Sequence, residues 1–339
     1  MFQTEINHFL QSFESPALTA FMQFITALGY LEFFLLFLLI FLMGINYKKG
    51  FILFMVLLWT AVVTMLAKNY FALPRPFHVD NTVQLLDGQL PDESTVTFSE
   101  RDAEGFWEGL PTEVIEATRK SEHLEYGFPS GHTSIAIAFW GALFYLYRKK
   151  WIRGICMALM VLIPFSRLYL GVHFLADVLG GLVLGGLMLA ISYYFILRPQ
   201  RLQPFMNKSH LPLAVNSTAA FLILDPLFCF PLLTPRLYIL PAFMLGFGIG
   251  FLLVARKGFP SPNSSLMHRI GRIAIGTLLF MGTGFLFKTL AATLGMEGNI
   301  WIEVLQNLLS AFVLVWGGVE IASKLGWWER EVRMEGAKV

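Results

Sequence analysis

Long apolar runs dominate this sequence and determine the kind of fold it can adopt. A helix needs about 20 mostly apolar residues to cross the hydrocarbon core of a bilayer. Because helices satisfy their own backbone hydrogen bonds inside lipid, such runs predict an all-α, polytopic transmembrane helix bundle. We place nine spans in the 339-residue chain, at 28–46, 50–71, 131–147, 151–168, 172–197, 211–233, 236–255, 271–292 and 301–323.

Composition agrees with a membrane protein and excludes several other classes. Hydrophobic residues make up 56% of the chain and charged residues only 14%, which is too apolar for a soluble domain. A formal net charge of +2 gives no reason to expect a nucleic-acid partner. Cys156 and Cys229 both lie in apolar runs and offer neither a disulfide framework nor metal-ligand spacing. We therefore expect no cofactor and no metal.

The predicted spans fall into a front part and a back part. Residues 1–27 carry apolar side chains at helical spacing and are expected to form a surface amphipathic segment, without a cleaved signal peptide. Residues 28–197 form a five-span core with a long loop at 77–128. Prolines and basic residues interrupt the apolar pattern at 198–210 and predict a linker. Residues 211–339 then form a four-span extension with a tail.

Basic residues predict the orientation of the bundle. Lys and Arg are enriched in the cytoplasmic loops of membrane proteins. Threading nine spans through a bilayer places five basic clusters on one face, at 48–49, 148–153, 198–208, 256–272 and 330–338. We therefore expect the amino terminus and the long loop outside and the carboxyl terminus in the cytoplasm. No glycosylation sequon reaches the predicted outer face, which favours a bacterial inner membrane.

Charged and hydrogen-bonding groups gather at the predicted outer ends of the front spans. They are Lys68 and Arg75 after the second span, Ser130, Gly131 and His132 at the start of the third, and Arg167, His173 and Asp177 between the fourth and the fifth. Ionisable groups are costly at membrane depth and mark functional sites. Three cations that meet at one surface need an anion, and the planar Arg fork suits phosphate oxygens. A helix start at Ser130 adds free backbone N–H groups, so the pattern predicts a phosphate site.

The histidines and the aspartate predict phosphoryl transfer that needs no metal. His173 and Asp177 are four residues apart, so on a helix the carboxylate can orient the imidazole ring. His173 would attack phosphorus, and His132 would protonate the leaving oxygen and then activate water. The three cations, Ser130 and the amide of Gly131 would stabilise the charge on the equatorial oxygens.

These residues resemble, in type, order and spacing, the three signature motifs of the type 2 phosphatidic acid phosphatase superfamily. The motifs correspond to Lys68 with Arg75-Pro76, then Pro129-Ser130-Gly131-His132, then Ser166-Arg167 with His173 and Asp177. The superfamily includes lipid phosphate phosphatases, undecaprenyl pyrophosphate phosphatases, glucose-6-phosphatases and vanadium haloperoxidases. The resemblance implies that His173 is the nucleophile, His132 the acid and Asp177 the orienting group. It extends from Lys68 to about residue 197 and supplies nothing for the back part.

Alternatives for the function remain open at this point. We expect hydrolysis of a lipid phosphate or diphosphate held in the bilayer, such as undecaprenyl pyrophosphate, phosphatidic acid or phosphatidylglycerol phosphate. Nine spans with an outside amino terminus are also similar to glucose-6-phosphatase, which cleaves a soluble ester, although Asp177 is not expected there. The other alternative is a non-catalytic phosphate or lipid transporter, against which the intact His132, His173 and Asp177 argue.

A few further features have simpler interpretations. Four glycines between residues 180 and 186 are expected to let helices approach closely. Asp225, inside the sixth predicted span, either has a function or pairs with a neighbouring helix. Lys288 and Glu303 lie near span ends, where snorkelling explains them. The loop at 77–128 either covers the phosphate site or is a solvated insertion.

Overall fold

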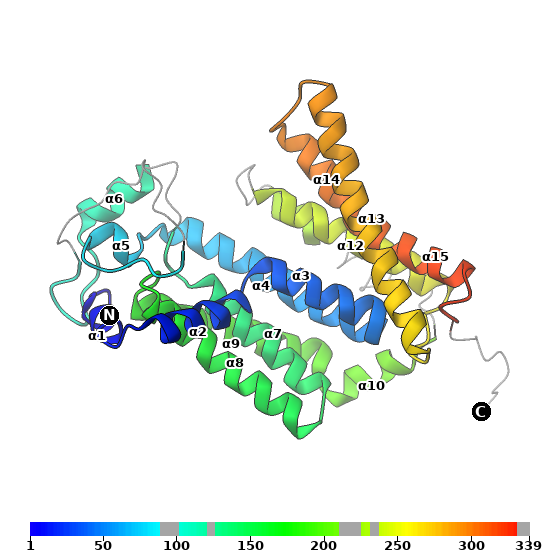
Figure 1. The fold of residues 1–339 in the computed structure, drawn as a ribbon, viewed down its shortest axis with the longest axis horizontal. Helices are drawn as coiled ribbons and strands as arrows, with labels where there is room; N and C mark the ends of the chain where they lie inside the picture. Colours follow the sequence, from blue (N-terminus) through cyan, green and yellow to red (C-terminus); the bar gives the residue numbers. More distant parts are fainter. Residues whose placement is uncertain (89–101, 121–125, 210–224, 231–236, 331–339) are drawn as a thin grey trace. The chain divides into compact units, whose positions relative to one another are not determined.

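In a computed structural model of the chain, two compact units are present. The described residues are 1–88, 102–120, 126–209, 225–230 and 237–330. Within these ranges the regular elements are helices and no strand occurs, which confirms the predicted all-α class. The first unit comprises residues 1–34 and 59–197, and the second comprises 35–58 and 198–339 (Figure 1). The second unit thus starts again at the predicted linker but also takes in residues 35–58.

The first unit is a helical bundle with two short helices in its loop. Its elements are α1 (Glu5–Gln11), α2 (Pro16–Ala27), the beginning of α3 (Leu31–Leu39), the end of α4 (Tyr47–Phe71), α5 (Pro76–Val79), α6 (Thr112–Lys120), α7 (Gly131–Leu146), α8 (Lys150–Tyr169), α9 (Leu175–Ser192) and the π-helical η2 (Tyr193–Leu197). Helix α7 packs against both α8 and α9, and α1 and α2 pack against α8. The helix starts of α7 and α9 therefore lie at the same end of this unit.

Two glycines allow the close contact between α7 and α9. A Cβ atom on Gly181 would lie 2.7 Å from the carbonyl oxygen of Ser130, and one on Gly185 would lie 2.5 Å from that of Ser134. Any larger residue would push the two helices apart, because protein interiors are close-packed. The predicted packing role is confirmed for these two positions, whereas Gly186 faces open space.

The helix α1 turns its amide side chains inward. Asn7 and Gln11 are buried, whereas Phe9 and Phe13 are 63% and 60% exposed. Two aromatic side chains of this segment therefore face outward, while Leu10 packs against a buried cluster and the two amides bond to the rest of the unit.

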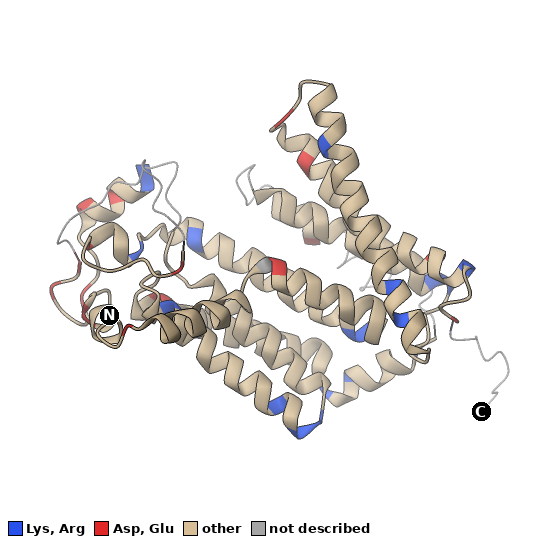
Figure 2. Cartoon of the chain, viewed as in Figure 1, with Lys and Arg blue, Asp and Glu red and all other residues tan. Residues whose placement is uncertain are grey.

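The described parts of the long loop are packed rather than extended. Val79, Leu110 and Val114 are buried in one cluster with Phe174, at the start of α9. Acidic residues colour this loop and the α5–α6 region red in Figure 2, and blue basic residues mark the opposite, α7–α8 end of the same unit. These described parts of the loop therefore pack against the start of α9.

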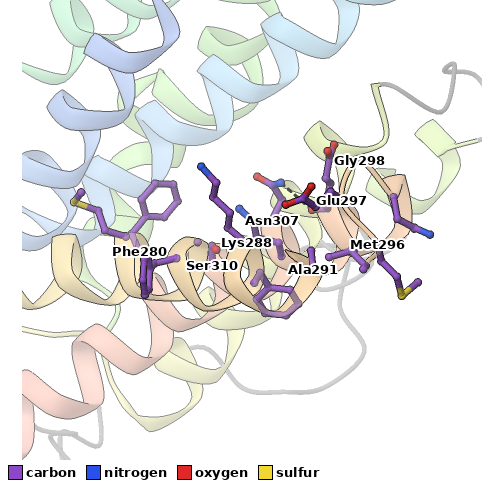
Figure 3. Close-up of a pocket in the computed structure, with 16 residues that line it drawn as sticks. Phe280, Lys288, Ala291, Met296, Glu297, Gly298, Asn307 and Ser310 are labelled. Carbon is purple, nitrogen blue, oxygen red and sulfur yellow. Dashed lines mark hydrogen bonds between the residues drawn. The ribbon is translucent and has the colours of Figure 1, made fainter. Parts of the chain in front are cut away.

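The second unit contains the remaining helices. They are the rest of α3, the π-helical η1 (Ile40–Ile45), the beginning of α4, α10 (Pro199–Asn207), α12 (Ile239–Lys257), α13 (Leu266–Thr293), α14 (Ile300–Phe312), the π-helical η5 (Val313–Gly317) and α15 (Gly318–Lys324). Helix α14 packs against α12 and α13. A pocket of about 530 Å³ lies between α13 and α14 and is lined by Lys288 and Glu303 among others (Figure 3). No predicted site residue lines this pocket.

Six helices of the described residues are long and apolar enough to cross a membrane, which confirms the polytopic prediction. A seventh span results if α2 and the helix that follows it, bent by 55°, are taken together. Helix α7 has only 16 residues, fewer than the predicted third span. The predicted sixth span at 211–233 falls largely outside the described residues; Asp225, which lies within it, is half-buried.

Candidate active site

The turn between α8 and α9 presents His173 beside Asp177. Nδ1 of His173 lies 3.0 Å from Oδ2 of Asp177, and the backbone N–H of Phe174 donates to the same oxygen at 2.9 Å. Both side chains are buried. Because the carboxylate accepts from Nδ1, Nε2 is left as the ring nitrogen with a free lone pair.

Gly171 gives this turn its shape. Its φ of +73° lies in the left-handed region, which glycine adopts without strain. A Cβ atom there would lie 2.3 Å from the carbonyl oxygen of Gln84. The turn can therefore pack directly against the backbone of the long loop, where the N–H of Leu86 donates to the carbonyl of Leu170 at 3.1 Å.

Asn7 of α1 holds the backbone of the same turn. Its side-chain Nδ2 donates to the carbonyl oxygens of Leu168 at 2.8 Å and of His173 at 3.1 Å. Gln11, one turn further along α1, donates to the carbonyls of Gln84 and Tyr169. The amino-terminal helix thus ties the turn and the loop together.

Ser130 caps the amino-terminal end of α7. Its hydroxyl oxygen accepts from the backbone N–H of Thr133 at 3.5 Å and from the Thr133 hydroxyl at 3.1 Å. The backbone N–H of Ser130 donates to the carbonyl of Asp177 at 2.9 Å. The second predicted motif is therefore bonded directly to the third, and the positive end of the α7 dipole lies beside His173.

Lys68, near the end of α4, is held close to this helix start. Its ammonium group donates to the carbonyl oxygens of Tyr126 and, at 3.2 Å, of Gly127. The N–H of Gly127 in turn donates to the carbonyl of Leu73 at 2.7 Å. A Cβ atom on Gly131 would lie 3.8 Å from Cε of Lys68, so the lysine stem passes beside the first residue of α7.

Arg75 lies at the start of α5 and is 8% exposed. Its backbone N–H donates to Nδ1 of His78 at 3.2 Å. The preceding residue, Pro74, lies against the site: a Cβ atom on Gly127 would be 2.6 Å from the Pro74 carbonyl oxygen and 2.9 Å from Oδ2 of Asp177. The first motif is therefore in contact with the Asp177 region through the chain at Gly127.

Arg167 is fully buried at the end of α8. Its Nη1 donates to the hydroxyl of Thr26 at 2.5 Å and to Oδ2 of Asp87 at 3.2 Å. Its Nε is buried without a hydrogen-bond partner. Nε2 of His132 is likewise buried and unpaired, while the ring edge packs against Tyr30 with centroids 4.6 Å apart. These two nitrogens are therefore able to form a hydrogen bond with a group bound at the site.

The electrostatics of the turn favour a neutral His173. Burial, together with the charges of Arg75, Lys68 and Arg167, lowers the pKa of His173 well below its usual value. The three cations therefore lie near enough to act on this ring. A neutral imidazole at neutral pH is the form that can act as a nucleophile.

The structure brings the eight predicted site residues to one end of the first unit. They are Lys68, Arg75, Ser130, Gly131, His132, Arg167, His173 and Asp177. Sequence reasoning missed four further residues that contact them, namely Asn7, Thr26, Tyr30 and Asp87. The only signal in the sequence was the acidity of the loop, which does not single out Asp87.

Comparisons with known proteins match the front part of the chain. The model of the PAP2 superfamily matches residues 49–201, a range that contains all eight predicted site residues. Lipid phosphate phosphatase delta of Arabidopsis thaliana is 27% identical over 216 residues, which cover 56% of this chain and 50% of the relative. Phosphatidylglycerophosphatase B of Bacillus subtilis is 39% identical over 72 residues, which cover 19% of this chain and 36% of the relative. The chain thus spans half or less of the length of these curated relatives.

A solved structure is also similar. LpxE of Aquifex aeolicus is 26% identical and covers 56% of this chain and 94% of its own, with a TM-score of 0.42. Thr26, Tyr30 and Asn7 lie outside the range that the superfamily model matches.

Proposed function

Since residues 49–201 of this chain belong to the PAP2 superfamily, we propose that the protein is an integral-membrane phosphatase that hydrolyses a lipid phosphate or lipid diphosphate. The similarity to lipid phosphate phosphatase delta and to phosphatidylglycerophosphatase B supports the lipid substrate. The observation that carries the proposal is the His173–Asp177 pair at 3.0 Å, which lies within the influence of three cations and of a second histidine, His132.

The reaction proceeds in two displacements at phosphorus. Nε2 of His173 attacks the terminal phosphorus, an N–P bond forms, and the bond from phosphorus to the leaving oxygen breaks. That oxygen belongs to the lipid alcohol in a monophosphate and to the lipid monophosphate in a diphosphate. His132 donates a proton to the leaving oxygen. His132 then removes a proton from water, which attacks the phosphohistidine and releases inorganic phosphate. Asp177 keeps the His173 ring oriented and stabilises the charge that develops on it.

The anion is stabilised by donors that are fixed before the substrate arrives. Lys68 is held by two carbonyl groups, and Arg167 by Thr26 and Asp87. Arg75 and the helix start at Gly131 complete the set. Preorganised donors of this kind lower the barrier because they need no rearrangement as charge develops on the equatorial oxygens.

The position of the site suits a substrate whose tail stays in the bilayer. The site residues lie at the ends of apolar helices rather than in their middle. The acidic loop and the basic α7–α8 turn lie at opposite ends of the first unit, as Figure 2 illustrates. By the positive-inside rule the site then faces the outside or periplasm, with a bacterial inner membrane as the host membrane. Undecaprenyl pyrophosphate, phosphatidic acid and phosphatidylglycerol phosphate are the substrates we would test.

A phosphate-release panel tests the proposal. The full-length protein, purified in detergent or nanodiscs, is incubated with lipid monophosphates, a prenyl diphosphate and glucose 6-phosphate, each with and without vanadate. We expect vanadate-sensitive release from at least one lipid and little from the sugar phosphate. Preference for glucose 6-phosphate would favour the soluble-ester alternative. No release from any phosphate would refute the phosphatase and revive the transporter alternative.

A further inference from the structure

The turn between α2 and α3 forms one wall of the candidate active site, although it lies outside the range matched by the superfamily model. Thr26 accepts a hydrogen bond from Nη1 of Arg167. A Cβ atom on Gly29 would lie 2.9 Å from Cδ2 of His132, so the backbone of the turn touches that ring. Tyr30 packs its ring against the edge of His132, with centroids 4.6 Å apart. This turn therefore contacts both Arg167 and His132.

Asp87 connects these contacts. Its carboxylate is 1% exposed, and its Oδ2 accepts from Nη1 of Arg167 at 3.2 Å and from the hydroxyl of Tyr30 at 2.8 Å. Burying an ion pair is costly, and further hydrogen bonds to the carboxylate offset part of that cost. The buried carboxylate of Asp87 thus accepts from two donors, one of which is Arg167, a cation that the proposed reaction uses.

The direction of the guanidinium follows from these bonds. Two side-chain hydrogen bonds of Arg167 come from Nη1, one to Thr26 and one to Asp87. Nε, on another edge of the fork, has no partner although it is buried. An arginine held by one edge presents its remaining N–H groups in a fixed direction, which suits an oxyanion.

We propose that Asp87 and Tyr30 are positioning residues of the phosphatase: Asp87 fixes Arg167 by Nη1 so that Nε faces the substrate phosphate, and Tyr30 fixes both Asp87 and the ring of His132. The inference rests on the proposed function, because it assigns Arg167 to the phosphate and His132 to the leaving oxygen. The rival explanation is that Asp87 competes with phosphate for Arg167. The two explanations predict opposite effects of removing the Asp87 charge.

The first experiment removes that charge. Asp87→Asn keeps the shape of the side chain, so we expect Arg167 to lose its fixed direction and the inhibition constant for vanadate to rise about tenfold, as for loss of a hydrogen bond to a charged group. KM for the lipid substrate should rise similarly while kcat changes less. The control is Asp80→Asn, in the same loop, whose carboxylate bonds to Thr4 and His8. This control should leave vanadate inhibition unchanged.

The second experiment separates the hydroxyl of Tyr30 from its ring. Tyr30→Phe keeps the ring but removes the hydroxyl that donates to Asp87, and it should reproduce a weaker form of the Asp87→Asn effect. Tyr30→Leu also removes the ring edge from His132, so kcat should fall several-fold further on an alkyl phosphate but not on p-nitrophenyl phosphate, whose leaving group needs no proton. Tyr169→Phe, which deletes another tyrosine hydroxyl of the same unit, is the matched control.

Vanadate binding to the full-length protein, measured by thermal shift, keeps the inference testable without turnover. If the wild type releases no phosphate but binds vanadate, the proposed function fails while the Asp87→Asn comparison still stands. Tighter vanadate binding by Asp87→Asn would overturn the positioning role in favour of competition. Unchanged binding in both Asp87→Asn and Thr26→Val, with both variants folded, would also overturn it.

Discussion

Replacing Asn7 with leucine tests whether α1 holds the turn that carries His173. Asn7 is fully buried, and its Nδ2 donates to the carbonyls of Leu168 and His173. Leucine has a similar volume but no donor, so Asn7→Leu removes both bonds with little change in packing. The residue lies outside the membrane-spanning helices and touches no predicted catalytic side chain.

The size of the destabilisation depends on the hydrogen bonds that each carbonyl oxygen keeps in Asn7→Leu. Leu168 keeps a hydrogen bond from the N–H of Gly171 at 3.2 Å, so its loss is about 1 kcal/mol. No second donor among the described residues reaches the His173 carbonyl, and a buried acceptor without a partner costs about 1–3 kcal/mol. Local destabilisation is then about 2–4 kcal/mol, which raises the open population of the turn roughly 30- to 700-fold at about 1.4 kcal/mol per tenfold.

Hydrogen exchange of the segment 168–177, followed by mass spectrometry in nanodiscs, measures that opening. We expect faster exchange there in Asn7→Leu together with reduced turnover. Gln23→Leu is the control, because its exposed amide also donates to a carbonyl, that of Leu86 at 2.7 Å, and should have little effect. Unchanged exchange in a folded Asn7→Leu protein would show that α1 does not support the turn.

Three further outcomes follow from the same turn. His173→Ala should abolish both turnover and acid-labile phosphoryl-enzyme formation from a radiolabelled substrate, and full turnover would contradict the phosphohistidine step. Gly171→Ala should lower the free energy of unfolding by at least about 1 kcal/mol, measured as a lower unfolding temperature, because φ is positive there and the new Cβ would meet Gln84. Gly154→Ala is the control, because a Cβ atom at Gly154 would enter open space, and it should leave the unfolding temperature unchanged. Because the pKa of His173 is lowered, its neutral form should persist below pH ~6.5, and kcat/KM should not yet fall at that pH through protonation of His173. A fall in kcat/KM at or above pH ~6.5 that is assigned to His173 would argue against a buried imidazole near three cations.

Local spacing allowed the chemistry-bearing residues to be predicted. His173 and Asp177 are four apart in the sequence, and the structure joins them by a hydrogen bond, with His173 in the turn before the N-cap residue Phe174 and Asp177 in the first turn of α9. Ser130 precedes a helix, where a serine side chain normally caps free N–H groups. These predictions depended on residues close together in the sequence, and such short spacings can be read from a sequence pattern.

The supporting residues could not be predicted in this way. Asp87 is one of many acidic residues in its loop, and its burial against Arg167 depends on the path of the chain in three dimensions. Asn7 lies on the polar side of an apparently peripheral helix. Hydropathy also gave no sign of the 55° bend after α2, because a bend is set by local backbone geometry rather than by apolar content. Tyr30, which packs against His132, lies in the turn at that bend.

The packing of the loop on the His173 turn restricts how substrate can enter and product can leave. Leu86 bonds to the backbone of Leu170, and Gln11 bridges Gln84 to the same turn, so these loop residues cannot lift away without displacing the proposed nucleophile. If substrate entered and product left by opening of this part of the loop, His173 would be displaced in each catalytic cycle. We expect a lipid to approach sideways, between helices and along the bilayer, so that lateral diffusion in the membrane, rather than loop opening, supplies the site.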